Sequence, residues 1–436
     1  MEYYLAIDIG ASSGRHIVGY AENGRVVTDE VYRFPNFVSE SEVGLTWDVG
    51  RLFEEVKTGI ARAFAKYPKI ESLSIDTWGV DYVLLRGEDE VLPVFAYRDS
   101  RTEEVIPEVH SIISEQELYA RTGIGFMAFN TVYQLYSDKK TGRLLGVTDM
   151  LMLPEYLMYK LTGARRRERT NATTSGLVNC ESLEYDPEIF DRLGLPSALI
   201  RPLCSPGESV GRLLPEIAAE VGGDTEVVLC ATHDTASAVE GIPMKKNSLY
   251  ISSGTWSLLG LKTDKAINDE SSRKSGYSNE GGVGYNRYQK NITGMWLIQN
   301  LRAELCPSLS FSEVTDLALT SDFCGVFDVN SPRLTAPESM KRAIAECLGT
   351  EVDKLSDADA FNAAYLSIAN EYARAIADLE RNVKKKYTEV YIVGGGAKND
   401  YLNSLTEEIT GKRVVALPIE ATTLGNLKVQ MSRREK

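Results

Sequence analysis

Residues 3–20, YYLAIDIGASSGRHIVGY, contain the pattern that decides the fold. Two apolar runs are separated by a turn of small residues, and a third strand-like run follows at 25–34 after the turn ENG. Runs of this length joined by glycine-containing turns predict an antiparallel β-meander. Asp48 then stands where it can cap a helix with apolar residues at helical spacing, and residues 71–75 form the next predicted strand. The first unit is therefore predicted to be mixed α/β.

A similar pattern begins again after Val227, where SLYISSGTWSLLGL (residues 248–261) places a small-residue turn between two apolar runs. The turns GASSGR and SSGTWS look like counterparts, which indicates a weak internal duplication, although two short turns can also match by chance. At 436 residues the chain exceeds the size at which a single hydrophobic core usually stops growing. We therefore predict an N-terminal domain over residues 1–243 and a C-terminal domain over residues 244–436.

The composition narrows the class of protein. Hydrophobic residues at 43% and charged residues at 25% are ordinary for a globular chain, and no apolar run is long enough to cross a bilayer. The N-terminus lacks the pattern of a secretory signal, so we expect a cytoplasmic protein. A net charge of -14 disfavours nucleic acid or an anionic membrane as a partner. The six cysteines form no close pair and the three histidines lack zinc spacing, so disulfides and a transition metal are not expected.

The first turn is a candidate phosphate-binding loop. Asp8 ends an apolar strand, Gly10 and Gly14 are predicted to permit unusual backbone angles, and the two serines and Arg15 supply hydrogen-bond donors. No Walker A motif or GxGxxG fingerprint occurs in the chain, so P-loop and Rossmann assignments are disfavoured. A small-residue turn after an aspartate is also typical of a plain hairpin, and this alternative stays open.

The second turn supports the phosphate interpretation. Ser252 to Thr255 offer a further set of amides and hydroxyls that could bind the same polyphosphate. Two such loops facing each other would form a clamp. Asp8 would then be placed to hold Mg²⁺, usually through water, because this ion keeps much of its hydration shell.

The segment ATHDTAS places Asp234 beside His233 after a buried strand. An isolated carboxylate there is costly unless it is used or hydrogen-bonded, which makes Asp234 a candidate general base for phosphoryl transfer. The alternative is a helix cap, in which Asp234 accepts from the backbone of Ala236 or Ser237. The two roles are compatible, and His233 is interpreted as a hydrogen-bonding neighbour.

Two polar segments could bind a polyol. In SIDTWGVDYVLL, Asp76 and Asp81 flank Trp78 and would offer an apolar ring with acceptors for hydroxyls, whereas the alternative is a β-bulge with two exposed aspartates. In AYRDSRT, Arg98 and Asp99 could complete a hydroxyl-binding wall or simply pair with each other on the surface.

A glycine run late in the chain is a candidate nucleoside site. A long amphipathic helix is predicted over residues 361–379, and it is followed by the strand EVYIV and then by Gly394 to Gly396. A strand that delivers three glycines suits close backbone approach to a flat ligand such as a nucleoside. A flexible strand-to-helix turn is the alternative.

Eight segments taken together resemble a known family: IDIGASSGR, IDTWGVD, AYRDSRT, TNATTSG, HDTASAV, SSGTWSL, NITGMWLIQ and IVGGGAKN, in this order. They are similar to the rhamnulokinases, which belong to the FGGY carbohydrate kinases, and the resemblance runs from the first strand to about Gly425. It implies a two-domain actin-like (ribonuclease H-like) α/β fold with a catalytic cleft between the domains. It also implies ATP-dependent, Mg²⁺-requiring phosphorylation of L-rhamnulose at the 1-hydroxyl, in L-rhamnose catabolism, by a monomer or weak homo-oligomer.

The resemblance assigns roles at matching positions of this chain. Asp234 is the implied proton acceptor. The implied ATP-contacting positions are Ala11, Ser12, Ser13, Gly14, Arg15, Thr255, Gln299, Gly394, Gly395 and Gly396. The implied sugar-contacting positions are Gly79, His233, Thr235 and Asn291. Reasoning from the residues adds Asp81 and Arg98 on the sugar side and Asp8 for the metal, whereas Asn291 and Gln299 come from the resemblance alone.

One departure from the family concerns the end of the sequence. The family continues well past its LGN motif, whereas this sequence stops at Lys436, with Lys428 where a glycine is usual. The closing segment of the second domain is therefore expected to be missing, with consequences for stability or activity. Two other functions stay open: a kinase for another ketose or polyol, and a non-catalytic nucleotide switch on the same fold.

Overall fold

The predicted meander forms the centre of the first sheet in the computed structural model, which describes residues 1–335, 337–417 and 419–433. Strands β1 (Tyr4–Ile9), β2 (Ser13–Glu22) and β3 (Arg25–Pro35) pair antiparallel in sequence order. The chain then crosses so that β6 (Ser72–Thr77) pairs parallel with β1 on its other side. The described residues give the sheet six strands, in the order β11-β12-β6-β1-β2-β3.

The first helix, α1 (Val49–Lys66), forms where its sequence signals predict it. The Asp48 side chain caps the helix by accepting a hydrogen bond from Arg51 N at 2.9 Å. One apolar face is buried against the first sheet, although Phe53 on that face is only partly buried. Local capping and 3.6-residue periodicity thus determine this element, and burial of the face stabilises it.

A second six-stranded sheet, counted over the same residues, repeats the topology of the first. Its order is β15-β16-β14-β13-β17-β18. β13 (Leu249–Ser253) pairs antiparallel with β14 (Trp256–Thr263) and parallel with β17 (Glu389–Val393), as β1 does with β2 and β6. β16 (Asn286–Thr293) follows β14 as β3 follows β2, and β18 (Arg413–Ala416) flanks β17 as β12 flanks β6. The duplication indicated by the two turns is therefore present in the strand order.

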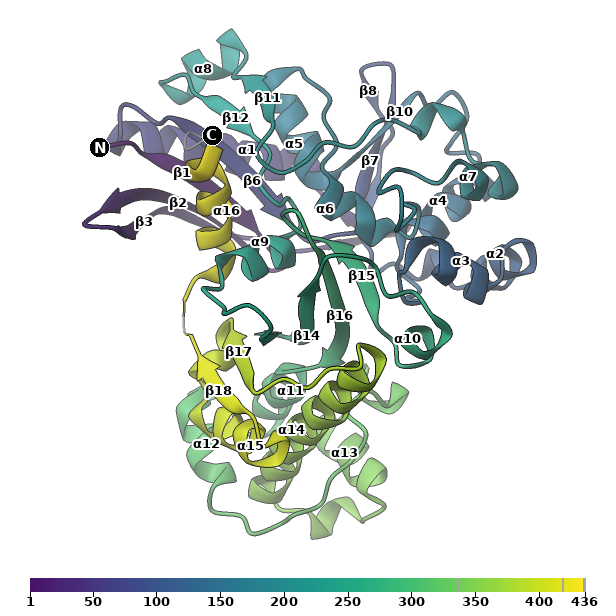
Figure 1. Cartoon of the computed structure of the whole chain (residues 1–436), viewed down its shortest axis with the longest axis vertical. Helices are drawn as coiled ribbons and strands as arrows, with labels where there is room; N and C mark the ends of the chain where they lie inside the picture. Colours follow the sequence, from purple (N-terminus) through teal and green to yellow (C-terminus); the bar gives the residue numbers. More distant parts are fainter. Residues whose placement is uncertain (336, 418, 434–436) are drawn as a thin grey trace.

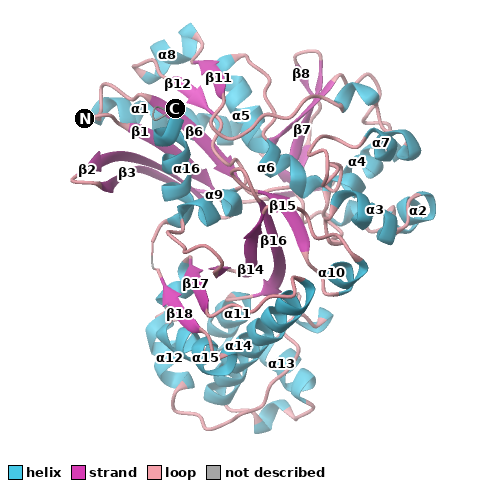
Figure 2. Cartoon of the chain, in the orientation of Figure 1, coloured by secondary structure: helices cyan, strands magenta, loops and turns pink. Residues whose placement is uncertain are grey.

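Figure 2 shows the two sheets in separate lobes, with most helices at their faces and edges. The remaining strands are β4 (Ser39–Ser41), β5 (Gly44–Trp47), β7 (Tyr82–Arg86), β8 (Asp89–Glu90), β9 (Val94–Phe95), β10 (Asp149–Met152), β11 (Ser209–Arg212), β12 (Glu226–Val228) and β15 (Ser278–Gly281). The helices of the first lobe are α2 (Ile106–Ile112), α3 (Glu115–Thr122), α4 (Thr131–Lys140), α5 (Leu153–Thr162), α6 (Arg169–Ala172), α7 (Pro187–Leu193), α8 (Pro215–Val221) and α9 (Asp234–Gly241). The second lobe contains α10 (Glu270–Lys274), α11 (Trp296–Leu305), α12 (Phe311–Ala318), α13 (Met340–Leu348), α14 (Asp357–Asn382) and α15 (Asp400–Thr410). No helix of the described segments is both long and apolar enough to cross a membrane.

The last helix, α16 (Ala421–Ser432), returns to the first lobe, where Figure 1 shows it in yellow beside β1. Leu427 is fully buried against Tyr4 and Ala6, and Gln430 donates to Leu5 O at 3.1 Å. α16, which belongs to the predicted C-terminal domain of residues 244–436, thus packs on the first sheet. Residues 336, 418 and 434–436 of that predicted domain lie outside the described residues. The boundary after residue 243 stays a prediction.

Helices α9 and α16 cross with almost no space between their backbones. A Cβ atom on Gly425 would lie 1.8 Å from Ser237 O, and one on Gly241 would lie 2.1 Å from Ala421 O. Both distances are far inside van der Waals contact with backbone atoms, which cannot rotate away. Glycine at these two positions therefore allows α16 to hold α9 in place.

Candidate active site

Three aspartates from distant parts of the sequence gather at one edge of the first sheet. Asp8 on β1 is the direct parallel partner of Asp76 on β6. The next residue of β6, Thr77, forms an isolated parallel bridge with His233, and its N–H donates to Thr232 O at 2.9 Å. This bridge brings Asp234, the residue after His233, to the same strand ends. Carboxyl ends of neighbouring parallel strands are where α/β sheets place their ligands.

Asp8 is buried and paired with the first turn. Its Oδ2 accepts from Arg15 Nε at 3.0 Å and from Nη2 at 2.9 Å, and Arg15 also forms an ion pair with Glu420. Burial raises the pKa of Asp8, the charge of Arg15 acts against this, and the nearby charge of Asp234 raises it further. The charges of Asp8 and Asp234 thus influence each other across the strand ends.

Asp76 has an oxygen that no protein group uses. Its Oδ2 accepts from Asn426 Nδ2 at 2.6 Å, while Oδ1 is buried without a hydrogen-bond partner among the described residues. Burial raises the pKa of Asp76 well above its usual value, and the charge on Asp8 adds to this effect. The same part of the chain contains no group of three or more His, Cys, Asp and Glu side chains that could hold a metal by themselves. Asp8 with a free oxygen of Asp76 beside it fits a cation that keeps most of its water, as Mg²⁺ does.

Asp234 is the first residue of α9, and its side chain is 30% exposed. Its Oδ1 accepts from Thr235 N at 2.5 Å and from Thr235 Oγ1 at 3.1 Å. The helix-cap alternative is wrong, because within the described chain its carboxylate makes no bond to the backbone of Ala236 or Ser237 and Ser237 N donates to His233 O. Oδ1 also lies 3.4 Å from His233 Nε2, so both neighbours in sequence contact this oxygen, and Oδ2 is left for another partner.

His233 lies between the two lobes. Its Nδ1 is 3.0 Å from Arg287 Nη2 and 3.2 Å from Glu280 Oε2, both on strands of the second sheet. Arg287 is fully buried and also pairs with Glu280 at 2.9 Å. Burial acts to raise the pKa of Glu280, but the charge of Arg287 together with hydrogen bonds from His233 and Gln289 lowers this pKa to about 2. A polar group of His233, Glu280 and Arg287 therefore connects the two lobes next to Asp234.

The DTWGVD loop is built around Asp81, which is 0% exposed. Its Oδ2 accepts from Trp47 Nε1 at 2.7 Å, Trp78 Nε1 at 2.8 Å and Tyr97 N at 3.1 Å. Burial raises the pKa of Asp81 to about 6 even though these donors act to lower it. The alternative of a bulge with two exposed aspartates is wrong. Asp81 fixes the orientation of the Trp47 and Trp78 indoles through these hydrogen bonds. Its complete burial does not support its predicted contact with a sugar.

The neighbouring sugar-side residues are placed differently. Gly79 allows the loop to pass Thr174, since a Cβ there would lie 2.8 Å from Thr174 Oγ1. Arg98 is exposed and donates to the hydroxyl of Tyr97 at 3.1 Å. The suggested surface pair is wrong, because Asp99 accepts instead from Leu45 N and Arg101 N and forms no ion pair with Arg98 in the described structure.

The first turn is a hairpin in which Gly14 is needed for packing and neither glycine has a left-handed backbone. Gly10 and Gly14 have negative φ values, so that part of the prediction is wrong. Gly14 is buried, and a Cβ there would lie 2.1 Å from the ring of Phe34. Ser12 is exposed at the tip of the turn, and Arg15 is directed toward Asp8. The hairpin alternative is correct as geometry, and it leaves Ser12 available for a ligand.

The predicted nucleotide positions meet around the end of β13. Thr255 Oγ1 is 3.4 Å from Gln299 Oε1, which joins the second turn to α11. Gly394 has φ +82, and a Cβ there would lie 2.6 Å from Ser253 O; a Cβ on Gly396 would lie 2.0 Å from Ser253 Oγ. Both glycines are therefore needed for packing against β13. Gly395 differs, because it is exposed and its Cβ position has nothing within 4 Å.

Two further sugar-side positions lie at the lobe interface. Asn291 is half-buried on β16, and the alternation of a strand puts it on the same face as Gln289 and Arg287, the residue that contacts His233. Thr235 is half-buried at the start of α9, where its hydroxyl contacts Asp234. Thr235 thus contacts Asp234 directly, whereas Asn291 lies on the strand face that carries Arg287.

Several residues of the site escaped the sequence reasoning. Asp76 was interpreted as a sugar acceptor, although it is the neighbour of Asp8, and Asn426, Glu280 and Arg287 were not singled out. A parallel pairing of the predicted strand at residues 3–9 with the one at residues 71–75 would have placed Asp8 and Asp76 side by side. The buried contacts of Asn426, Glu280 and Arg287 join segments distant in sequence, and no local pattern signals them.

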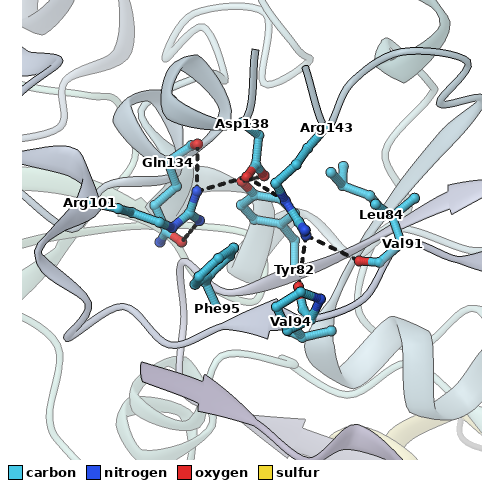
Figure 3. A pocket seen from close by; sticks show the side chains of 10 residues that line it. Tyr82, Leu84, Val91, Val94, Phe95, Arg101, Gln134, Asp138 and Arg143 are labelled. Carbon is cyan, nitrogen blue, oxygen red and sulfur yellow. Dashed lines mark hydrogen bonds and ion pairs between the residues drawn. The ribbon is translucent and has the colours of Figure 1, made fainter. Parts of the chain in front are cut away.

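A small polar pocket lies behind the DTWGVD loop and is shown in Figure 3. Arg101 and Arg143 converge on Asp138, which also accepts from the hydroxyl of Tyr82 at 2.7 Å. Gln134 connects this group to the loop by donating to Asp81 Oδ1 at 3.3 Å. The cavity volume of about 10 Å³ is at the lower limit for one water molecule, so the pocket supports the loop and takes no sugar.

Comparison with known proteins relates this geometry to a family. The N-terminal and C-terminal domains of the FGGY family of carbohydrate kinases match residues 3–241 and 249–433. The rhamnulokinase of Oceanobacillus iheyensis is 40% identical over 98% of this chain and 92% of its own length. The rhamnulokinase of Bacillus subtilis is 37% identical over 98% of this chain and 90% of its own length.

Solved structures agree on the fold. Ligand-bound xylulose kinase from Lactobacillus acidophilus superimposes with a TM-score of 0.85 at 17% identity, covering 100% of this chain and 90% of that chain. Plasmodium falciparum glycerol kinase with ADP gives a TM-score of 0.80 at 14% identity, with coverage of 100% and 90%. The prediction of a two-domain, actin-like α/β fold is confirmed. Because both family domains match and full-length relatives exceed one third identity, the chain belongs to the FGGY family of carbohydrate kinases.

Proposed function

We propose that this chain transfers the γ-phosphoryl group of ATP to the 1-hydroxyl of L-rhamnulose, giving L-rhamnulose 1-phosphate and ADP. The observation that carries the proposal is the nearly full-length match to proteins named rhamnulokinase, at up to 40% identity. The convergence of Asp8, Asp76 and Asp234 at one strand edge supports it. The enzyme works in the cytoplasm, in L-rhamnose catabolism, as a monomer or weak homo-oligomer.

Asp234 is the general base. As the sugar oxygen forms its bond to the γ-phosphorus, the bond from that phosphorus to the β–γ bridging oxygen breaks, and Asp234 takes the hydroxyl proton. Thr235 donates to Oδ1, which leaves Oδ2 for the sugar hydroxyl. His233, Thr235, Gly79, Arg98 and Asn291 border the sugar, and Asp81 fixes the indoles of its loop.

Asp8, with the free oxygen of Asp76 beside it, would hold a hydrated Mg²⁺. Bound Mg²⁺ would neutralise charge on the phosphates of ATP. Residues Ala11 to Arg15 contact these phosphates on one side and Thr255 with Gln299 on the other. Gly394 to Gly396 border the nucleoside, with the open position of Gly395 giving the closest approach.

Sugar specificity provides the direct test of the proposed reaction. ADP formation measured in a coupled assay should give a kcat/KM for L-rhamnulose at least about 10-fold above those for L-fuculose and D-xylulose, because a misplaced hydroxyl leaves buried polar groups unpaired. An equal or higher kcat/KM for L-fuculose or D-xylulose would show that L-rhamnulose is not the preferred substrate. ADP release that no sugar stimulates would instead indicate a nucleotide switch.

Asp8→Asn should chiefly change the metal dependence. We expect the Mg²⁺ concentration for half-maximal activity to rise about 10- to 100-fold, because an amide orients metal-bound water poorly. Asp89→Asn, at an exposed position of the short strand β8, provides the matched control and should leave the Mg²⁺ titration unchanged. An unaltered Mg²⁺ titration for Asp8→Asn would remove Asp8 from the metal site.

A further inference from the structure

A buried hydroxyl beneath the active site is shared by two carboxyl groups. Thr232 is 0% exposed, and its Oγ1 lies 2.7 Å from Glu155 Oε1 and 2.9 Å from Glu168 Oε2. Both glutamates are also buried. A threonine hydroxyl carries a single hydrogen, so it cannot donate to two ionised carboxylates at once. One of the two glutamates must therefore carry a proton and donate it to Thr232 Oγ1.

The remaining contacts identify which glutamate is neutral. Glu168 is surrounded by donors: Oε1 accepts from Thr170 N at 2.8 Å, and Oε2 accepts from Thr232 N at 3.1 Å and from Asn171 N at 3.3 Å. Glu155 Oε2, in contrast, is buried with no hydrogen-bond partner in the described part of the chain. An ionised oxygen without donors is far more costly than a neutral carbonyl oxygen. The charge therefore belongs on Glu168.

The electrostatics agree with this count of hydrogens. Burial raises the pKa of Glu155 to about 8, with the hydroxyl of Thr232 acting against the shift and the charge of Glu168 adding to it. Burial also raises the pKa of Glu168, but four hydrogen bonds to its carboxylate act to lower it. The difference between the two groups is geometric: both oxygens of Glu168 accept hydrogen bonds, whereas Glu155 Oε2 has no donor among the described residues.

We propose that at neutral pH Glu155 is a neutral acid that donates to Thr232, whose hydroxyl donates to the Glu168 carboxylate, and that this relay positions the base Asp234. The inference rests on the proposed role of Asp234. Thr232 is two residues before Asp234, and its N–H, its carbonyl and its hydroxyl are all bound to the first lobe. Glu155, Thr232 and Glu168 are positioning residues, since none of them reaches the reacting atoms.

The segment TNATTSG has no role in the proposed reaction, but it connects the relay to the DTWGVD loop as well as to Thr232. Glu168 caps α6, the turn that begins this segment. Asn171 Nδ2 donates to Thr232 O at 3.3 Å and to Trp78 O at 3.4 Å, and Thr174 Oγ1 accepts from Val80 N at 3.0 Å. The same anchor therefore holds both the base loop and the sugar loop at a fixed separation.

In the proposed relay the hydrogen bonds are donated from Glu155 to Thr232 and from Thr232 to Glu168. Two isosteric variants test this direction. In Glu155→Gln the amide nitrogen donates to Thr232 as the acid does, whereas in Glu168→Gln an amide replaces an acceptor that must receive several donors. We expect Glu168→Gln to lower kcat about 10- to 100-fold more than Glu155→Gln, because small misplacements of a catalytic group are costly, with less than about threefold change in either KM. Equal losses in the two variants, or the reverse order, would overturn the proposal.

A second pair of variants, at Thr232, keeps the proposal testable if one of the glutamate variants does not fold. Thr232→Ser retains the hydroxyl and should keep most of the turnover, whereas Thr232→Val has nearly the same shape without a donor and should resemble Glu168→Gln. If both Thr232 variants have equal kcat at similar melting temperatures, the relay is refuted.

A spectroscopic readout separates this inference from the proposed reaction. The infrared difference spectrum of wild type minus Glu155→Gln should contain the C=O stretch of a protonated carboxylic acid at neutral pH. The difference spectrum with Glu168→Gln should contain a carboxylate band instead. This result is independent of any sugar, so a chain that fails to phosphorylate L-rhamnulose but shows these bands contradicts only the proposed function. A carboxylate band for Glu155 overturns the relay whatever the substrate is.

Discussion

Replacing Asp234 with asparagine should lower kcat by about 10²- to 10⁴-fold, the range associated with loss of a general base. Asparagine has nearly the same shape and keeps an oxygen that can accept from Thr235, so α9 should form as before. It cannot take a proton from the sugar hydroxyl at neutral pH. Since the base acts only in the transition state, the KM values for ATP and sugar should change little.

The matched control for this variant is Asp357→Asn. Asp357 is also the first residue of a helix, α14, so its removal takes the same negative charge from a helix N-terminus. We expect it to leave kcat unchanged. An equal loss of kcat in both variants would assign the effect to the helix terminus. Either that result or a normal kcat in Asp234→Asn would remove Asp234 from the base role.

The second large effect is expected at the crossing of α9 and α16. Gly425→Ala puts a methyl group 1.8 Å from the carbonyl oxygen of Ser237, and backbone atoms can make room only if the helices separate. Overpacking of this kind costs about 1–3 kcal/mol in the free energy of unfolding. Because α9 begins with Asp234, we also expect kcat to fall in the folded fraction. Thermal melting and steady-state kinetics on the same preparation measure both effects.

Gly50→Ala is the control for this substitution. Gly50 is exposed in the first turn of α1, and its added Cβ would meet only Asp48 Oδ1 at 3.5 Å, which is ordinary contact. Alanine in a helix is favoured over glycine by about 0.5–1 kcal/mol, so this variant should be neutral or slightly stabilised. If Gly425→Ala melts at the same temperature as Gly50→Ala, the crossing of α9 and α16 can accommodate a methyl group. That result would contradict the predicted loss of stability.

Local patterns predicted the parts of the fold that depend on neighbours in sequence. The meander of β1 to β3 follows from apolar runs with glycine turns, and α1 follows from the cap at Asp48 and its apolar spacing. The return of α16 could not be predicted this way. Its apolar residues would suit either sheet, and only long-range contacts such as that of Leu427 with Tyr4 select the first.

The same distinction applies to the site. The position of Asp234 after a buried strand was visible in the sequence, whereas the environment of Asp81 was not. Its donors come from Trp47, Trp78 and Tyr97, which are brought together by tertiary packing. Gly14 is a similar case, because the sequence indicates a permissive backbone where the structure uses the missing side chain to seat Phe34.

The return of α16 has a mechanical consequence. The chain passes between the lobes twice, once between Gly241 and Leu249 and once between Ala416 and Ala421, so two tethers join bodies that each keep their own sheet. A body attached at two points retains one rotation, about the line through them. We therefore expect closure over a bound sugar to follow a rotation about this line, which would bring the predicted nucleotide positions of the second lobe toward Asp234 by the same path each time.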